Sequence, residues 1–468
     1  MNERERQWQI FVHNREAVLE ALRRGECDGI LPAARGFLDG FASFLQEGGV
    51  LPLFDTFPDH RRRRSIAPFF FCHTLVYRPL FQLPRLADIG NTLFRSPSIL
   101  RLLGFNARQI EAGFYASQGQ KPFDVESISE FFIPATSEDF FSFQLRWLEA
   151  IRRAWPQVFA AGLWVMDSVH FSTPRGARGL PPGEYKVCIL GVWQEGEVWP
   201  LLWRFAEAHT ADLSLGHEVM DGALRVLGRG VIRRLLVDRG FIDGAWLTKL
   251  WREGVTVIIG VRSDMDIFAD LQGLARLPDT HWQELPPPQN HRQPPPRRAI
   301  TAFHELQSWS TCEAPLCGCL IRDTYPDHVQ YQAVVMTAPT ATANDIYRGR
   351  QQRWDLEEVL MALTRYWRFD QLPPCHRGVA WAMVHFTLLA FTLLAIYLAH
   401  SDTDRRPWSP PPLPLPEREL AVYVGPYFAL LRASELLTII LENYEAWLRN
   451  KDRLLEALRL TEGTARPP

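Results

Sequence analysis

The sequence predicts an α/β protein in which a mixed β-sheet carries helices on its faces, flanked by an N-terminal helical domain and a C-terminal helical tail. The chain has 468 residues, of which 47% are hydrophobic and 22% charged, a composition typical of proteins that bury a core. In residues 163–263 the apolar positions change from helical spacing to short runs rich in Val, Ile, Trp and Phe, and such runs then alternate with helices.

Residues 1–155 are predicted to be mostly helical, because apolar residues recur at spacings of three and four in segments 37–46 and 140–155. Between them, residues 60–110 contain nine arginines and a single acid, Asp88, which gives this segment a charge of +8. Two short helices are expected in 86–105, and a helix pair with a basic face suits contact with DNA phosphates. The arginines expected at such an interface are Arg61, Arg62, Arg63, Arg64, Arg95 and Arg101.

The net charge of the whole chain is −2, which excludes a protein that packages nucleic acid through a large overall positive charge. It does not exclude a DNA-binding enzyme, because the +8 segment leaves −10 for the remaining residues. A second interpretation of the arginines stays open. Of the 51 basic residues, 47 are Arg, which a GC-rich coding sequence would also produce, and the basic helices would then be a solvated hairpin.

The seven cysteines form an odd, scattered set that suits a reducing compartment, and the charged N-terminal segment does not resemble a secretory signal. We therefore expect a cytoplasmic protein. One stretch, 379–399, has 21 residues without a formal charge and is long enough to span a bilayer. Because there is no second stretch of this kind, we favour the alternative interpretation, a helix buried on all sides, and expect no membrane partner.

Residues 156–265 are predicted to form the first part of the core. Three strands at 163–171, 185–193 and 198–208 follow one another with short turns between them. A helix, a strand, a second helix and a further strand come next, at 215–228, 233–241, 244–254 and 255–263. This order of elements is the skeleton of the ribonuclease-H-like fold.

Residues 266–340 are irregular and partly Pro-rich, and they are predicted to be a β-rich insertion with strands at 299–312 and 328–337. The rest of the chain is expected to contain three segments: residues 341–400, which complete the core with a long helix and the apolar helix, a Pro-rich linker at 401–418, and the helical tail at 419–468.

Two acids follow apolar strands in the predicted sheet, Asp167 and Asp238, and the edge where strands end is where such sheets bind ligands. A third candidate is Glu357, which lies four residues after Arg353 on the same face of a helix. Each has an ordinary alternative, a loop or capping acid for the aspartates and a surface ion pair for Glu357. If the three converge, they suit two divalent cations such as Mg²⁺ or Mn²⁺, which stabilise the attacking and leaving oxygens of a phosphodiester.

The ordered set Asp167, then Asp238 in VDRGF, then Glu357 in RWDLEE resembles the DDE transposases of bacterial insertion sequences. The closest group is the cut-and-paste, insertion-sequence-four type, which carries a Tyr-Arg-Glu-Lys signature and a β-rich insertion before the Glu helix. The resemblance covers about residues 163–399, and the long interval between Asp238 and Glu357 is where that group carries its insertion.

The resemblance implies that Asp167, Asp238 and Glu357 are the catalytic and metal-binding triad, and that Arg353 is the signature Arg. Two positions depart from the signature: Arg350 stands where Tyr is expected, and Thr364 stands where Lys is expected. Tyr347 and Arg365 are their neighbours, and with Arg353 they complete the expected DNA contacts. Glu358 is an alternative third acid, which points about 100° away on an ideal helix.

The resemblance further implies strand cleavage and strand transfer at insertion-sequence ends, with Mg²⁺ or Mn²⁺ as cofactor. The expected partners are double-stranded DNA, both terminal inverted repeats and target, and a second copy of the chain in a synaptic homodimer. Such a protein would be bacterial, and associated with the nucleoid when bound. The two signature departures support an alternative, a catalytically decayed or domesticated transposase that acts as a DNA-binding protein.

Three further groups of residues have possible roles. His170 points to the opposite face of its strand from Asp167, which favours a structural role. Trp282 and Trp309 are candidates for stacking on a flipped base, although most of the 16 tryptophans are expected in the core. Zinc ligation is a minor alternative for four residues, Cys312, Cys317, Cys319 and His328.

Overall fold

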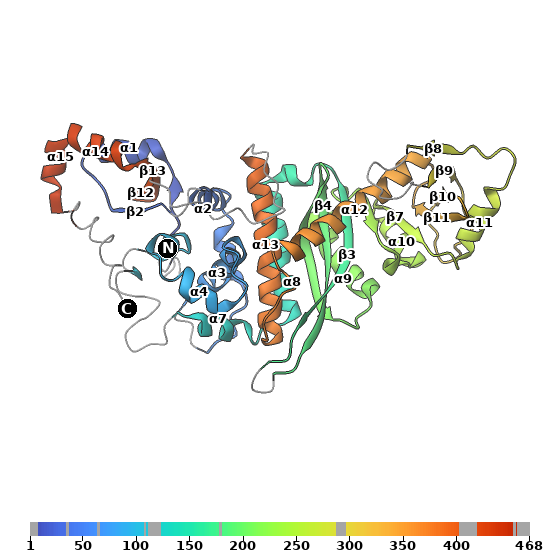
Figure 1. The fold of residues 1–468 in the computed structure, drawn as a ribbon, viewed down its shortest axis with the longest axis horizontal. Coiled ribbons are helices and arrows are strands. Elements are labelled where there is room, and N and C mark those ends of the chain that lie inside the picture. Colours follow the sequence, from blue (N-terminus) through green and yellow to red (C-terminus); the bar gives the residue numbers. More distant parts are fainter. Residues whose placement is uncertain are drawn as a thin grey trace. The chain divides into compact units, whose positions relative to one another are not determined.

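The computed structural model describes residues 8–33, 37–62, 66–106, 109–110, 123–176, 180–286, 296–401, 419–452 and 455. Arg63 and Arg64 lie outside the described residues. The chain forms two compact units (Figure 1). Unit 1 combines Met1–Trp155, Ser172–Gly183 and Thr364–Pro468, and unit 2 combines Pro156–Phe171 and Glu184–Leu363.

Unit 2 is built on a nine-stranded sheet with the order β5-β4-β3-β6-β7-β11-β10-β9-β8. Its first five strands are β3 (Leu163–Thr173), β4 (Gly183–Gln194), β5 (Glu197–Glu207), β6 (Arg234–Val237) and β7 (Thr256–Val261). β4 and β5 pair antiparallel, whereas β3, β6 and β7 pair in parallel. Two helices occupy the crossovers, α9 (Asp212–Leu227) and α10 (Gly244–Arg252). The predicted ribonuclease-H-like order is therefore confirmed.

The predicted β-rich region continues this same sheet. It contains α11 (Asp266–Leu274), β8 (Gln283–Leu285), β9 (Arg297–Phe303), β10 (Cys317–Thr324) and β11 (Val329–Met336). β11 joins β7 antiparallel, so the insertion adds four strands to the edge of the core. β10 was not among the predicted strands, and the strand predicted at 299–312 ends at Phe303.

A buried ion pair links this added part of the sheet to the long helix α12 (Ala343–Arg365). Asp323 of β10 is 1% exposed and accepts two hydrogen bonds from Arg298 of β9, at 2.6 and 2.8 Å. Arg298 also donates to the hydroxyl of Tyr347 on α12 at 3.1 Å. One guanidinium therefore holds two strands and a helix together.

We expect Asp323→Ala to lower the free energy of unfolding by about 2–3 kcal/mol, because it leaves the half-buried Arg298 charge without its partner. Chemical denaturation measures this loss. Asp327→Ala is the matched control, since Asp327 lies in an exposed turn with its side chain 82% accessible and pairs with the exposed neighbour His328. An equal loss in both variants would contradict the role of the pair.

Unit 1 is mostly helical in its N-terminal part, as predicted. Its described helices are α1 (Arg15–Arg23), α2 (Phe37–Glu47), α3 (Pro68–Leu80), α4 (Leu86–Thr92), α5 (Pro97–Leu102), α7 (Val125–Phe132) and α8 (Ser137–Ala154). The break expected around Arg95 separates α4 from α5, and the side chain of Ser96 caps α5 by accepting from the backbone of Ile99.

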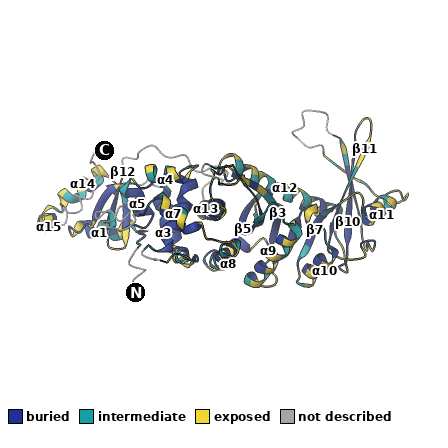
Figure 2. Cartoon of the chain, turned by 90° about the horizontal axis from the view of Figure 1, so that it is seen from below, coloured by how far each residue is buried: buried dark blue, intermediate teal, exposed yellow. Residues whose placement is uncertain are grey.

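The apolar stretch forms α13 (Arg377–His400), which packs against α2, α3, α7 and α8. Its most apolar window is completely buried, and Figure 2 shows the helix in the colour of buried residues. Its polar residues are accommodated inside: Thr387 accepts a 2.7 Å hydrogen bond from the buried guanidinium of Arg78. The interpretation as a buried core helix therefore agrees with the packing.

A second, four-stranded sheet in unit 1 joins both ends of the chain in the order β1-β13-β12-β2. β1 (Val12–His13) pairs with β13 (Tyr427–Arg432), and β2 (Gly29–Pro32) pairs with β12 (Glu419–Val424). The predicted helical tail at 419–468 is therefore helical only in its later part: a β-hairpin comes first, and α14 (Ala433–Glu442) and α15 (Tyr444–Arg449) follow it. Alternating apolar residues around the Gly425 turn account for the hairpin.

Candidate active site

The parallel pairing of β3 and β6 brings the two aspartates together. Met166 lies opposite Val237 in this register, so Asp167 and Asp238 are the next residue on each of two neighbouring strands. β6 ends at Val237, whereas β3 continues beyond Asp167. Asp238 therefore follows the end of its strand, as predicted. Asp167 instead lies within β3, just after the last residue of β3 that pairs with β6.

The turn after β6 holds the carboxylate of Asp238. One carboxylate oxygen accepts the backbone N–H of Gly240 at 2.6 Å. Phe241 of the same turn is buried and packs on Gly216 of α9, where a Cβ atom would lie 2.8 Å from two ring carbons. The close contact between helix and ring fixes the turn, and with it the position of Asp238.

Helix α12 supplies the third acid. Arg353 donates to Asp167 at 3.1 Å and also forms an ion pair with Glu357 of its own helix. The helix is tied to the sheet by Asp355, which accepts a 2.6 Å hydrogen bond from the indole of Trp193 on β4. Glu358 is exposed, so Glu357 is the acid that shares the Arg353 guanidinium with Asp167.

The environment of Asp167 changes the pKa of its carboxyl group. Burial raises the pKa of Asp167 to about 6 from 3.8. The N–H of Ser168, at 2.8 Å, and the guanidinium of Arg353 act in the opposite direction, while the negative charges of Asp238 and Glu357 raise the pKa further. The nearby positive charge therefore does not offset the effects of burial and of the two neighbouring carboxylates on the pKa of Asp167.

The donor set has the chemistry that Mg²⁺ prefers, since all three groups are carboxylates. Among the described residues, however, no three His, Cys, Asp or Glu side chains are grouped closely enough to hold a metal ion as they stand. The Arg353 guanidinium supplies positive charge between Asp167 and Glu357 instead. The three residues therefore fit a divalent cation in donor type and charge. A cation bound there would compete with the Arg353 guanidinium for the carboxylates of Asp167 and Glu357.

Two arginines of the predicted DNA surface face the interior of unit 1. Arg61 forms a bidentate pair with Asp59 at 2.9 and 2.8 Å, and its guanidinium lies over the rings of Phe71 and Phe131. Arg101 is only 5% exposed. We correct the expected role of both residues from phosphate contact to packing within the unit.

Other predicted DNA-contact residues differ in accessibility. Arg62 and Arg365 are exposed, and Arg95 is exposed with a single hydrogen bond, at 3.2 Å, to Asn91. Tyr347 is 8% exposed, and its hydroxyl is engaged by Arg298, so it is not placed as a phosphate ligand. Arg62, Arg95 and Arg365 remain predictions as DNA contacts.

The zinc alternative is wrong. Cys317 pairs with Met336 at one end of the β10–β11 hairpin, while His328 precedes Val329, which lies opposite Thr324 at the other end. Four candidate ligands at such a separation cannot surround one ion, and the described residues contain no group of side chains that could hold a metal ion.

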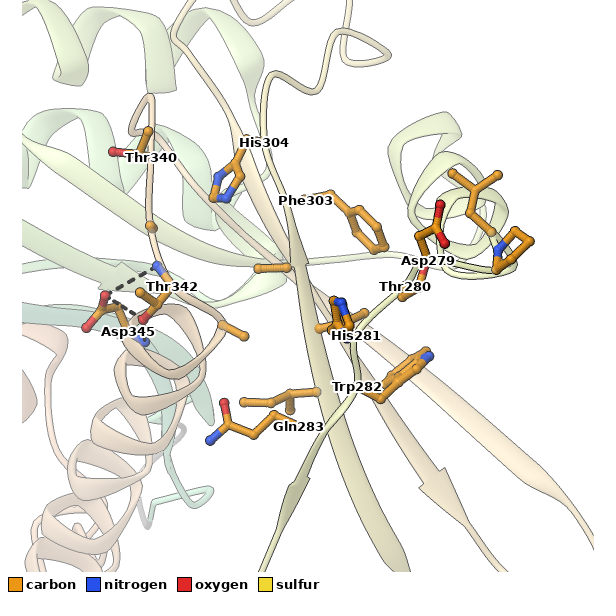
Figure 3. Close-up of a pocket in the computed structure, with 17 residues that line it drawn as sticks. Asp279, Thr280, His281, Trp282, Gln283, Phe303, His304, Thr340, Thr342 and Asp345 are labelled. Atoms are coloured by element: carbon orange, nitrogen blue, oxygen red, sulfur yellow. Dashed lines mark hydrogen bonds between the residues drawn. The ribbon is translucent and has the colours of Figure 1, made fainter.

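The two candidate tryptophans have different surroundings, and His170 is exposed. Trp309 is 8% exposed and belongs to the core. Trp282 is half-buried beneath the guanidinium of Arg322, 4.1 Å from the ring centre. It borders an open cavity of about 970 Å³ between the segment before β8, the end of β9 and the start of α12, as Figure 3 shows.

Comparison with known proteins gives one match to a family. Residues 195–393 match the family model described as the transposase DDE domain. This part of the chain is therefore similar to the DDE domain of transposases. The matched segment contains Asp238 and Glu357 and begins after Asp167. No curated protein matches the sequence.

Among solved structures, the cryo-EM structure of a piggyBac transposase synaptic complex with hairpin DNA is similar at 10% sequence identity and a TM-score of 0.40. The alignment covers 92% of this chain and 87% of that one.

Proposed function

We propose that this protein is a DNA transposase that cleaves DNA strands at the ends of an insertion sequence and transfers the freed 3′ ends to target DNA. The observation that carries the proposal is that Arg353 joins Asp167 to Glu357, next to Asp238 at the end of the neighbouring strand. Asp167, Asp238 and Glu357 come from two neighbouring strands and one helix, and the negative charges of Asp238 and Glu357 both contribute to the raised pKa of Asp167. Asp238 and Glu357 lie within the segment that matches the transposase DDE domain.

We propose that Asp167, Asp238 and Glu357 hold Mg²⁺ or Mn²⁺. These ions would supply Lewis acidity at the phosphodiester and a lowered pKa for the attacking water or 3′-hydroxyl. The chain's own groups orient the ligands: the N–H of Ser168 binds Asp167, the N–H of Gly240 binds Asp238, and Arg353 holds Glu357. Without compensating charge, three carboxylates would repel a DNA phosphate, which explains the need for cations.

The partners of this function are also part of the proposal. They are the terminal inverted repeats, target DNA and a second copy of the chain in a synaptic complex, in the bacterial cytoplasm. The exposed Arg62, Arg95 and Arg365 supply positive charge for phosphate contacts. A second function, DNA binding by a decayed transposase, is favoured by the residues at two signature positions, Arg350 and Thr364.

The test uses linear DNA that carries the sequences flanking the reading frame, incubated with the protein and Mn²⁺. We expect the wild type to nick this DNA and Glu357→Gln to lose at least about a hundredfold in rate, because one metal-binding carboxylate is removed. Glu358→Gln is the matched control, since Glu358 is the next residue on α12 and is exposed, and it should cleave normally.

Absence of cleavage by the wild-type protein, with DNA binding intact, would favour the decayed transposase. Normal cleavage by Glu357→Gln would remove this carboxylate from the proposed site. If Glu358→Gln alone lost DNA cleavage, Glu358 rather than Glu357 would be the third acid of the site.

A further inference from the structure

The second half of helix α12 is buried along one apolar stripe, with polar residues of the site on its flanks. The stripe consists of Leu356, Val359 and Leu363. Successive residues of a helix are turned by about 100°, which puts Arg353 and Glu357 on one flank of the stripe and Asp355 on the other. Apolar burial is not directional, so the stripe alone does not fix the rotation of the helix about its axis.

A hydrogen bond leaves α12 on each flank of this stripe. On one flank, Arg353 donates to Asp167 of β3 at 3.1 Å. On the other flank, Asp355 accepts the indole N–H of Trp193 of β4 at 2.6 Å. β3 and β4 are neighbours in the sheet, so the two bonds hold the helix to adjacent strands from opposite sides. Hydrogen bonds are directional, and this pair therefore restricts the rotation of the helix.

The first half of α12 is held by different contacts. A Cβ atom at Gly349 would lie 2.4 Å from the Cδ1 atom of Ile258 on β7, so helix and strand approach closely there. The hydroxyl of Tyr347 accepts from Arg298. Both contacts lie more than two helical turns before Glu357. The part of the helix that carries the third acid therefore depends on the bonds of its own flanks.

We propose that Trp193 is a positioning residue of the carboxylate site. Its hydrogen bond to Asp355 sets the rotation of the second half of α12. That rotation directs Glu357 towards the group that Arg353 shares with it, and leaves the neighbouring Glu358 exposed. The inference rests on the proposed function, because the direction of Glu357 matters if this residue is the third acid.

The position of α12 is measured without metal or DNA, through the coupling energy between Arg353 and Asp167. Wild type, Arg353→Gln, Asp167→Asn and the double variant are unfolded in denaturant with a chelator at about pH 8. We expect Trp193→Phe, which keeps an aromatic ring but removes the N–H, to lower this coupling to less than about half. Trp199→Phe is the matched control, because the indole of Trp199 on β5 donates to Glu197 of its own strand.

Asp355 provides variants at the other end of the bond. Asp355→Ala should lower the coupling as Trp193→Phe does, and the two changes together should lower it no further. Asp355→Asn keeps an oxygen that accepts the indole N–H, and it should retain most of the coupling. An unchanged coupling in Trp193→Phe, or an equal loss in Trp199→Phe, would overturn the positioning role.

The cleavage reaction gives a second readout. With Mn²⁺ and saturating DNA, we expect Trp193→Phe to cleave at least about tenfold more slowly, because small displacements of a reacting group slow the chemical step. Its affinity for DNA in the presence of a chelator should equal that of the wild type. Cleavage by Trp193→Phe at the wild-type rate would overturn the inference as well. If the wild type itself does not cleave, the proposed function fails, while the coupling energies still decide the role of Trp193.

Discussion

Replacing Asp167 by asparagine is expected to stabilise the folded protein at neutral pH and, at the same time, to abolish DNA cleavage. Burial raises the pKa of Asp167 to about 6, against 3.8 for the ordinary carboxyl. The folded state therefore binds more protons than the unfolded state between these two values. The contribution of Asp167 to the free energy of unfolding therefore falls as the pH rises from 3.8 to about 6. Above about pH 6 the full destabilisation by this group is present.

Asparagine carries no charge and removes this cost, so we expect a gain of about 1–3 kcal/mol at neutral pH and no gain at about pH 4. Thermal unfolding of wild type and variant across this pH range measures the difference. Asp221→Asn is the control, because Asp221 is half exposed and pairs at the surface with Lys249. A variant that is less stable than the wild type at neutral pH, or that still cleaves DNA, would contradict this account of Asp167.

Gly378→Ala is expected to destabilise unit 1 by at least about 3 kcal/mol. A Cβ atom at Gly378 would lie 2.1 Å from the carbonyl oxygen of Phe132, 2.9 Å from that of Ile133 and 3.1 Å from that of Ala135. All three neighbours are backbone atoms, which cannot rotate away as a side chain can. The start of α13 would have to move away from the end of α7, and the packing of the core helix would be disturbed.

The matched control is Gly273→Ala on α11, another helical glycine, where an added Cβ atom would meet no atom within 4 Å. The same substitution should there stabilise the protein by about 0.5–1 kcal/mol, because alanine favours the helix. Denaturant midpoints of the two variants should move in opposite directions. If Gly378→Ala lowered the free energy of unfolding by no more than about 1 kcal/mol, the prediction would be wrong, because α7 and α13 could then move apart at little cost.

The central sheet could be predicted because its information is local. Each strand from β3 to β7 is a short apolar run with a recognisable turn or helix on either side, and Asp238 directly follows such a run. The spacing of four between Arg353 and Glu357 likewise predicts a shared helix face. Which carboxylate shares Arg353 with Asp167 is a matter of helix rotation, and the exposure of Glu358 became apparent only from the structure.

The features that escaped prediction depend on distant residues. Arg61 and Arg101 lie in an Arg-rich segment with no local sign that they are enclosed. Asp59 and aromatic rings from α3 and α7 surround Arg61, and rings from Phe11 and Tyr423 receive Arg101.

The four-stranded sheet of unit 1 imposes an order of events on synthesis. β1 and β2 leave the ribosome early, but the first of their partner strands begins only at Glu419. At about 5–20 residues per second, the early strands wait roughly 20–80 s for their hydrogen-bonding partners. A polypeptide that stops before Glu419 never completes this sheet, so this part of unit 1 forms only on chains whose translation has run past the hairpin.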